Sequence, residues 1–323
     1  MPPADARFLA AALALGERAR GLSGTNPNVG CVIVRDGRVI GRGWTQPGGR
    51  PHAEAMALAE AGAAARGSDV YVTLEPCAHK SDRGPACLDL LIAAAPARVF
   101  SGCIDIDKRT FGKGIANLLA AGIDVASDQD MTIAATRSMA GYFTRLQKER
   151  PHVTLKLALS LDGCIALADG RSRWITGARA RAHAHLERAR CDAILVGAGT
   201  MRADNPQLDV RLEGLTQRAP QRIVLGSGDV PDGWQRISAP PDIAMLGVNW
   251  LLVEGGAQTA AAFLRADLVD RLLLYRAPII IGGGLAGIGD IGLGTLDDAH
   301  GRWRLHDRRT LGADVVEIYD RAG

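Results

Sequence analysis

Pro51-His52-Ala53-Glu54 opens an alanine-rich run, and Pro76-Cys77 and then Cys87 follow it along the chain. Proline is favoured at helix starts, so we expect a helix over 52–65. Histidine nitrogen and cysteine thiolate are common zinc ligands, and a catalytic zinc keeps one position open for water. The pattern therefore predicts one zinc ion held by His52, Cys77 and Cys87.

Glu54 follows His52 by two residues, and in the first helical turn both side chains can reach a metal off the helix end. We expect Cys77 to end a strand and Cys87 to open the next helix. Two helix N-termini would then point at the site and favour thiolates. Removal of an amino group from a ring carbon needs a group that moves a proton from water to the leaving amine. We assign this catalytic role to Glu54.

Other interpretations of this pattern stay open. Nucleobase deaminases carry H-x-E followed by P-C-x-x-C, whereas residues 78–86 separate the two cysteines here. The longer loop suggests a substrate other than plain cytosine or adenine. The site could also be a structural one, closed by His79 as a fourth ligand, or the histidine and cysteines could be unrelated.

The composition is that of an ordinary globular protein. With 323 residues, 47% of them hydrophobic and 23% charged, the chain is long enough for about two domains. The net charge is only +3 and no Lys/Arg block occurs, so we expect no nucleic-acid partner. No apolar run reaches the ~18 residues that span a bilayer, so we expect no membrane partner.

Two further features favour a cytoplasmic protein. The apolar stretch Phe8–Gly16 has the length of a signal segment, but Asp5 precedes it and charged residues follow it at once, which favours an amphipathic helix. The six cysteines are too sparse for a disulfide scaffold.

Both halves alternate strand-like and helix-like stretches, which predicts an α/β fold with helices covering mixed sheets. In the first half the expected strands are Val29–Arg35, Arg38–Gly43, Val70–Leu74 and Arg98–Ser101, and the expected helices are His52–Ala65, Ala86–Ala94 and Ile115–Ala121. In the second half the expected strands are Val153–Leu159, Ala193–Val196, Arg222–Leu225, Trp250–Val253 and Arg271–Tyr275, and the clearest helices are Ala178–Ala189 and Ala257–Leu264.

Asp36-Gly37 is a strong signal for a hairpin between the first two strands. The polar stretch Thr144–Pro151 marks a boundary, so we predict domains over 1–147 and 151–323.

Three glycine-rich stretches stand out in the second half. We expect a glycine turn at 197–200, after a strand, and a phosphate cradle where Val253-Glu254-Gly255-Gly256 leads into a helix. Residues 282–287 fit G-x-G-x-x-G, but no convincing helix follows, so we interpret them as a flexible loop and not as a dinucleotide-binding turn.

The first half resembles the deaminase half of the bifunctional riboflavin-biosynthesis deaminase–reductases. The resemblance lies in Thr25-Asn26-Pro27-Asn28-Val29-Gly30-Cys31, His52-Ala53-Glu54 and Glu75-Pro76-Cys77-Ala78-His79. It implies a cytidine-deaminase-like zinc domain that deaminates 2,5-diamino-6-ribosylamino-4(3H)-pyrimidinone 5′-phosphate, with Asn26 near the pyrimidine. Arg83 or Lys80 could meet the phosphate or ribose, or could be solvated loop charges.

The second half resembles the reductase domain of the same family. The matching motifs are Lys156–Gly163, Trp174–Gly177, Ala193–Thr200, Asp204–Leu208 with Arg211, and Val253–Gly256. The resemblance implies a dihydrofolate-reductase-like α/β domain that binds NADPH and reduces C1′ of the ring-opened ribosylamino group. The implied NADPH contacts are Ala158, Trp174, Thr200, Asp204 and Gly256. The implied substrate contacts are Ser172, Arg188, Leu208, Arg211 and Glu254. Candidates for proton handling are Lys156, Asp204 and Glu254.

The chain departs from the family pattern in two places. The family usually has Gly-(Arg/Lys)-Thr-Pro-Pro before the second cysteine, whereas Ser81–Ala86 stands here and is one residue longer. The segment between Arg211 and Glu254 is shorter than in typical members, which could weaken the reductase.

We therefore predict a bifunctional enzyme of riboflavin biosynthesis that acts on a small phosphorylated pyrimidine and is at least a homodimer. One alternative is a zinc deaminase of another nucleobase with a non-catalytic second half. Another is a zinc protein without enzymatic activity.

Overall fold

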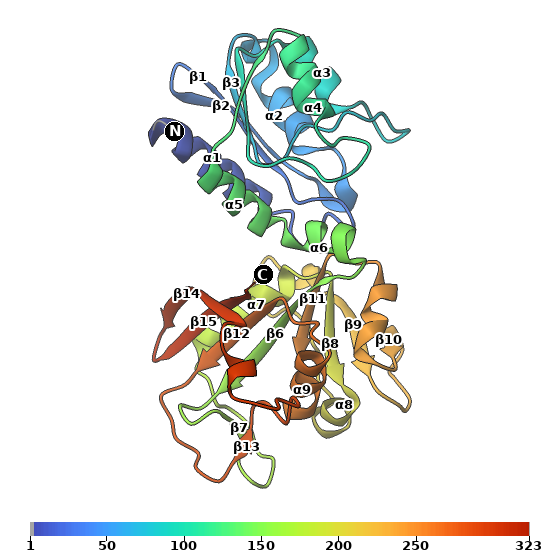
Figure 1. Cartoon of the computed structure of the whole chain (residues 1–323), viewed down its shortest axis with the longest axis vertical. Coiled ribbons are helices and arrows are strands. Elements are labelled where there is room, and N and C mark those ends of the chain that lie inside the picture. The colour runs from blue at the N-terminus through green and yellow to red at the C-terminus, as the bar shows by residue number, and fades with distance from the viewer. Residues whose placement is uncertain (1–2, 323) are drawn as a thin grey trace. The chain divides into compact units, whose positions relative to one another are not determined.

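A computed structural model describes residues 3–322 of the chain. The chain divides into two compact units, Met1–Glu149 and Arg150–Gly323. Each has its own sheet and hydrophobic core (Figure 1), so the α/β prediction is confirmed for both.

The first unit is built on a five-stranded sheet in the order β2-β1-β3-β4-β5. The strands are β1 (Gly30–Arg35), β2 (Arg38–Trp44), β3 (Asp69–Val72), β4 (Arg98–Ser101) and β5 (Asp124–Ala126). β1 runs antiparallel to β2 and β3, whereas β3, β4 and β5 are parallel. The predicted hairpin is confirmed: Asp36 and Gly37 have φ of 51° and 72°, the left-handed conformations that its tight turn requires.

Helices cover both faces of this sheet. They are α1 (Pro3–Gly16), α2 (Ala53–Ala61), α3 (Cys87–Ala94), α4 (Lys113–Ala120), α5 (Gln129–Ser138) and α6 (Ala140–Lys148). Cys31 and Ile33 of β1 pack in the cluster that contains α2, whereas Val32 and Val34 pack in the cluster that contains α1. This alternation is the period of two that a strand buried on both faces must have.

Glycine lets α2 lie unusually close to β2. A Cβ placed on Gly43 would lie 2.0 Å from the carbonyl oxygen of Ala53, so no other residue fits there. His52 is the N-cap of α2 and Glu54 lies in its first turn. The close contact therefore fixes the helix end that carries both residues.

The second unit contains an eight-stranded sheet in the order β10-β9-β8-β11-β6-β12-β15-β14. Its strands are β6 (His152–Leu159), β8 (Ala193–Gly197), β9 (Gln221–Leu225), β10 (Trp234–Ile237), β11 (Trp250–Glu254), β12 (Arg271–Arg276), β14 (Trp303–Leu311) and β15 (Asp314–Arg321). The first six in this order are parallel, and β15 and β14 are antiparallel additions. The helices are α7 (Ala178–Ala189), α8 (Ala198–Asp204) and α9 (Ala257–Arg265). α7 packs on one face, against Leu273 and Tyr275, and α9 packs on the other.

Two expectations about helices and loops need correction, and some elements were not predicted. Thr144–Lys148, expected as part of a linker, belong to α6. Residues 198–204, expected to begin with a glycine turn, form α8. α5 and the β14–β15 hairpin were not expected at all. Most residues of β14 are exposed and polar. Its sequence therefore lacks the alternation of apolar and polar residues that identifies a strand.

The glycine stretch 282–287 lacks the following helix that a dinucleotide-binding turn requires, as expected. It contains the short strand β13 (Leu285–Ala286), which pairs with β7 (Cys164–Ala166). No helix follows it directly. Among the described residues, no helix has the length and apolar character that a membrane crossing requires.

Candidate active sites

His52, Cys77 and Cys87 come together in the first unit, with their ligand atoms within 4.8 Å of one another. His52 Nδ1 lies 3.2 Å from Cys87 Sγ and 3.5 Å from Cys77 Sγ. A tetrahedral zinc ion with ordinary bond lengths separates such ligand atoms by about 3.5–3.8 Å. The three residues therefore fit a zinc ion.

His79 does not join this group of described residues. Its Nδ1 lies 3.3 Å from the hydroxyl of Thr110 instead. The geometry thus gives no support to the alternative of a closed, four-ligand structural site. Three protein ligands leave one position of a tetrahedral ion for water, as in catalytic zinc sites.

The surroundings of the cysteines favour a thiolate. Cys87 begins α3, as expected, but Cys77 lies in the loop after β3 and not at the strand end. The Cys87 thiol and N–H, together with His52, stabilise the Cys77 thiolate and lower its pKa to about 4. The Cys87 N–H lies 3.3 Å from Cys77 Sγ. A metal ligand must be deprotonated, so this loop is suited to hold one.

Glu54 is 3% exposed and lies in the same pocket as His52 and Cys77. Burial raises the pKa of its carboxyl group. A raised pKa brings a carboxyl group closer to neutral pH, where it can both take up and release a proton.

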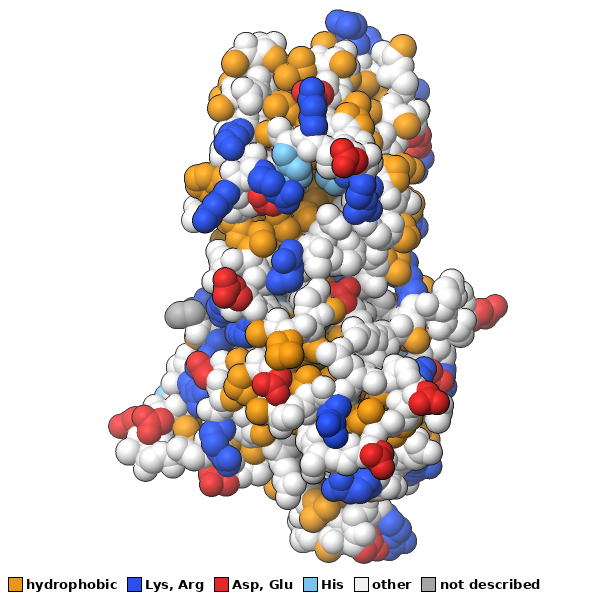
Figure 2. Space-filling model, turned by 90° about the vertical axis from the view of Figure 1, so that its right-hand side faces the viewer, with side chains coloured by type: hydrophobic (Ala, Val, Ile, Leu, Met, Phe, Trp, Pro, Cys, Tyr) orange, Lys and Arg blue, Asp and Glu red, His pale blue; other side chains and the backbone are white. Residues whose placement is uncertain are grey.

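His52, Glu54 and Cys77 line a pocket of ≈ 430 Å³. Figure 2 shows Lys or Arg and histidine side chains around a hollow in the upper part of the molecule. Basic side chains that line this pocket are Arg50, Arg83, Arg109 and Arg145. This charge suits an anionic substrate group.

Asn26 and Arg83 lie in the pocket wall, whereas Lys80 is not among the residues that line it. Lys80 is exposed and pairs with Asp89 at 3.4 Å. Arg83 donates a hydrogen bond of 2.7 Å to the carbonyl oxygen of Gly48. Of the two loop cations, only Arg83 is thus placed at the pocket.

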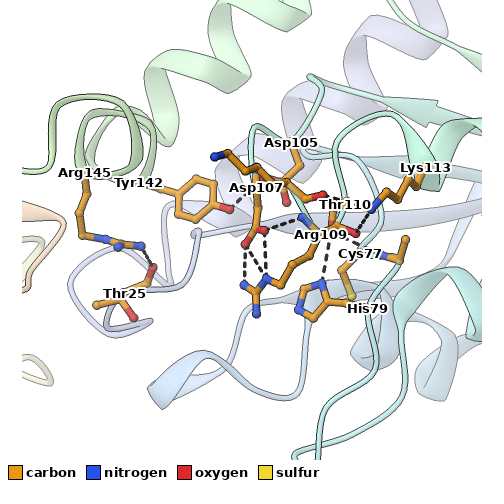
Figure 3. A network of polar contacts seen from close by, with 12 residues as sticks. Thr25, Cys77, His79, Asp105, Asp107, Arg109, Thr110, Lys113, Tyr142 and Arg145 are labelled. Carbon is orange, nitrogen blue, oxygen red and sulfur yellow. Dashed lines mark hydrogen bonds and ion pairs between the residues drawn. The ribbon is translucent and has the colours of Figure 1, made fainter.

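One side of the pocket was not anticipated from the sequence. The Tyr142 hydroxyl donates to Asp105 Oδ1 at 2.9 Å, and Arg109 Nε donates to Asp107 Oδ1 at 3.0 Å. Figure 3 shows these side chains grouped close to Cys77 and His79. Asp105 and Asp107 follow β4, so their place beyond the carboxyl end of a parallel strand was the available signal.

The two carboxyl groups of this wall have pKa values shifted in opposite directions. Burial raises the pKa of Asp105, whereas the bonded Arg109 lowers the pKa of Asp107 to about 2. Glu75 connects the segment after β4 to the loop that contains Cys77. Its carboxylate accepts hydrogen bonds from the backbone N–H groups of Asp105, Gly112 and Ile115.

In the second unit, Lys156, Arg188 and Glu254 form one ion network. Arg188 Nε and Nη2 donate to the two oxygens of Glu254 at 2.7 and 2.9 Å. Lys156 Nζ lies 3.5 Å from Glu254 Oε2. Burial acts to raise the pKa of Glu254, but the two cations outweigh it and lower this pKa to about 2.

Because the folded pKa of Glu254 lies below the unfolded value of ~4.3, its charge stabilises the fold above that pH. That contribution is lost as the pH falls from ~4.3 towards 2. We expect the free energy of unfolding to fall more steeply over this range in the natural protein than in Glu254→Gln. Urea unfolding followed by tryptophan fluorescence measures this, since Trp44 alone among the tryptophans lies in the first unit. Parallel pH profiles would contradict it.

Thr200 and Gly256, two predicted NADPH contacts, lie side by side at the carboxyl ends of β8 and β11. A Cβ on Gly256 would be 3.8 Å from Thr200 Oγ1. Gly256 is the N-cap of α9, and no side chain caps the free N–H groups there. A Cβ on Gly197 or Gly255 would collide with the Thr259 side chain, so both positions require glycine. The helix start at Gly256 suits the phosphate groups of a dinucleotide.

The remaining predicted residues are more dispersed. Ala158 lies on β6, two residues beyond Lys156, and Leu208 is buried. Arg211 is exposed and bonds Asp209 at 2.9 Å. Ser172, Trp174 and Asp204 are exposed as well. Trp174 is 67% exposed and lies under the guanidinium group of Arg181. None of these three makes a contact with the ion network among the interactions of the described residues.

Comparison with known proteins supports the predicted family for both units. Residues 2–103 match the cytidine and deoxycytidylate deaminase zinc-binding region, and residues 151–235 and 242–316 match the RibD C-terminal domain. The riboflavin biosynthesis protein RibD of Escherichia coli is 37% identical over 96% of this chain and 98% of its own length.

Two solved structures are similar over nearly the whole chain. Acinetobacter baumannii RibD has a TM-score of 0.87 and 32% identity, covering 99% of both chains. A diaminohydroxyphosphoribosylaminopyrimidine deaminase/5-amino-6-(5-phosphoribosylamino)uracil reductase of Thermotoga maritima has a TM-score of 0.86 and 28% identity, covering 98% of this chain and 99% of its own. The chain therefore belongs to the RibD family of bifunctional riboflavin-biosynthesis enzymes, with a zinc-dependent deaminase domain followed by an NADPH-dependent reductase domain.

Proposed function

We propose that the chain deaminates 2,5-diamino-6-ribosylamino-4(3H)-pyrimidinone 5′-phosphate and then reduces the ribosyl group of the product to ribityl. The observation that carries this proposal is a pocket lined by His52, Cys77, the buried Glu54 and several arginines, with Cys87 beside the two ligand residues. A zinc ion held by His52, Cys77 and Cys87 would supply Lewis acidity, which makes water a stronger nucleophile at neutral pH.

Glu54 carries the proton in this first reaction. It removes one from the attacking water and delivers it to the leaving amine, so that ammonia departs. Its raised pKa supports both directions of transfer. Asn26, in the pocket wall, orients the pyrimidine, and Arg83 is the loop cation placed to meet the phosphate or ribose.

The reductase unit must supply one proton for each hydride that the cofactor delivers. NADPH, when bound, provides the hydride to C1′, and the nitrogen on C1′ gains the proton. Lys156 is the donor that the ion network supports best, because its Nζ lies 3.5 Å from the Glu254 carboxylate. Asp204 is exposed and lies outside that network, which makes it the weaker candidate.

NADPH and substrate are assigned to neighbouring parts of this unit. Contacts proposed for NADPH are Ala158, Trp174, Thr200, Asp204 and Gly256. Contacts proposed for the substrate are Ser172, Arg188, Leu208, Arg211 and Glu254. Arg188 already holds both oxygens of Glu254, so it would bind a substrate phosphate through its remaining N–H groups or by exchanging partners.

The proposal extends to a cytoplasmic enzyme that is at least a homodimer, as the family resemblance implies. Light scattering coupled to size-exclusion chromatography measures the mass against the 34.0 kDa of one chain. A mass of one chain at micromolar concentration would contradict the dimer.

One assay tests the two activities together. The purified protein is incubated with the diaminopyrimidinone phosphate, with and without NADPH, and the products are resolved by mass. We expect the deaminated ribosyl compound without NADPH and the ribityl compound with it. Deamination without reduction would contradict the reductase assignment and would favour a weakened second half. No release of ammonia would contradict the deaminase assignment.

A further inference from the structure

A buried hydrogen-bonded pair lies on the sheet face covered by α7. Tyr275 of β12 is 1% exposed, and its hydroxyl oxygen lies 2.8 Å from Nδ1 of His183 on α7. The two rings meet edge to face, with centroids 5.8 Å apart. Burial raises the pKa of Tyr275 and lowers the pKa of His183, so both rings are uncharged near neutral pH.

This pair adjoins the ion network of the reductase unit. In the parallel ladder between β6 and β12, Lys156 pairs with Leu273 and Ala158 pairs with Tyr275. Residues two apart on a strand share a face, so Lys156 and Tyr275 project to the same side. Lys156 Nζ lies 5.8 Å from the centroid of the Tyr275 ring, within the range of a cation–π contact.

The ion pair between Lys156 and Glu254 is long. Arg188 donates hydrogen bonds of 2.7 and 2.9 Å to both oxygens of Glu254, whereas Lys156 Nζ lies 3.5 Å from one of them. A lysine ammonium on four flexible carbons needs more than one such contact to stay in one place. The ring of Tyr275, itself fixed by His183, supplies the second contact.

We propose that Tyr275, held by His183, is a positioning residue that fixes the ammonium group of Lys156 for proton delivery in the reductase reaction. The inference rests on the proposed role of Lys156. Tyr275 donates no proton itself. The hydride comes from NADPH, the proton passes from Lys156 to the nitrogen on C1′, and solvent then reprotonates the amine.

The test separates the ring of Tyr275 from its hydroxyl group. Tyr275→Leu removes the ring, and we expect kcat of the reductase to fall about 10-fold, while the KM for NADPH stays within about twofold. Tyr275→Phe keeps the ring and loses only the bond to His183, so we expect a smaller fall of about threefold. Val316→Ala is the matched control, because Val316 pairs with Tyr275 from the other side, in the same buried cluster. It should leave kcat within about twofold.

A double-mutant cycle with Lys156→Met identifies the residue through which Tyr275 acts. We expect Lys156→Met to lower kcat strongly, and Tyr275→Leu or Tyr275→Phe to change kcat less than about twofold in that background. Persistence of the full Tyr275 effect without Lys156 would overturn the inference and leave the role of Lys156 intact. Unchanged kcat in Lys156→Met alone would overturn the role of Lys156 and the inference with it. Tryptophan fluorescence reports whether the reductase unit of each variant is folded, because all the tryptophans except Trp44 lie in that unit. Tyr275→Phe carries the test if Tyr275→Leu does not fold.

Discussion

Glu54→Gln is expected to lower the rate of ammonia release by about 10²–10⁴-fold, the usual contribution of a positioned acid–base group. Glutamine has nearly the same shape as glutamate but cannot carry the proton from water to the leaving amine. The zinc ligands are unchanged, so the zinc content should stay at one per chain. Steady-state deamination and metal analysis of the same sample measure both quantities.

The same variant should reduce the deaminated compound at the natural rate, because Lys156 and Glu254 belong to the other unit. Glu60→Gln is the matched control. Glu60 lies on the same helix, α2, but it is exposed and pairs with Arg42 at 2.9 Å. A deamination rate near that of the natural protein in Glu54→Gln would show that Glu54 is not the proton carrier.

Cys87→Ser is expected to remove zinc and deamination together. Serine replaces a thiolate by a hydroxyl group, which remains protonated and is a much poorer zinc ligand. His52 and Cys77 alone leave two of four positions to water. We expect less than about a tenth of the natural zinc content after dialysis, since even the loss of an outer-shell partner of a metal ligand typically weakens metal binding by about 10–100-fold.

Cys103→Ser provides the control for this loss. Cys103 is a buried thiol of the same unit that bonds the carbonyl oxygen of Thr73 at 3.4 Å and lies outside the metal-binding group. It should keep its zinc even if burial of a hydroxyl group lowers stability. Full zinc retention in Cys87→Ser would mean that another residue is the third ligand.

Local patterns in the sequence were sufficient to predict which residues would form the zinc site. Each ligand is recognisable from its immediate neighbours: His52 at a helix start after proline, Cys77 after proline, and Cys87 at the next helix start. The mixed sheet was likewise predictable, because β1 and β2 alternate around a two-residue turn whose conformation Asp36-Gly37 favours. The position of Cys77 was less certain, since β3 ends at Val72 and the loop beyond it has no periodic pattern.

The sequence by itself therefore predicted the two α/β units and the candidate residues His52, Glu54, Cys77 and Cys87, because each is identified by its residue type and its immediate neighbours. That His52 meets Cys77 and Cys87 across 25 and 35 positions was decided by the tertiary structure. Tertiary structure decided the pocket wall and the reductase network. Tyr142 meets Asp105 across 37 positions, and Lys156 meets Glu254 across 98. Such pairs form only when strand order and register bring distant segments to the same face, and no local propensity encodes that register. The family resemblance named Lys156, Arg188 and Glu254 as site residues, but their ion network and the place of Tyr275 beside Lys156 came from the structure alone.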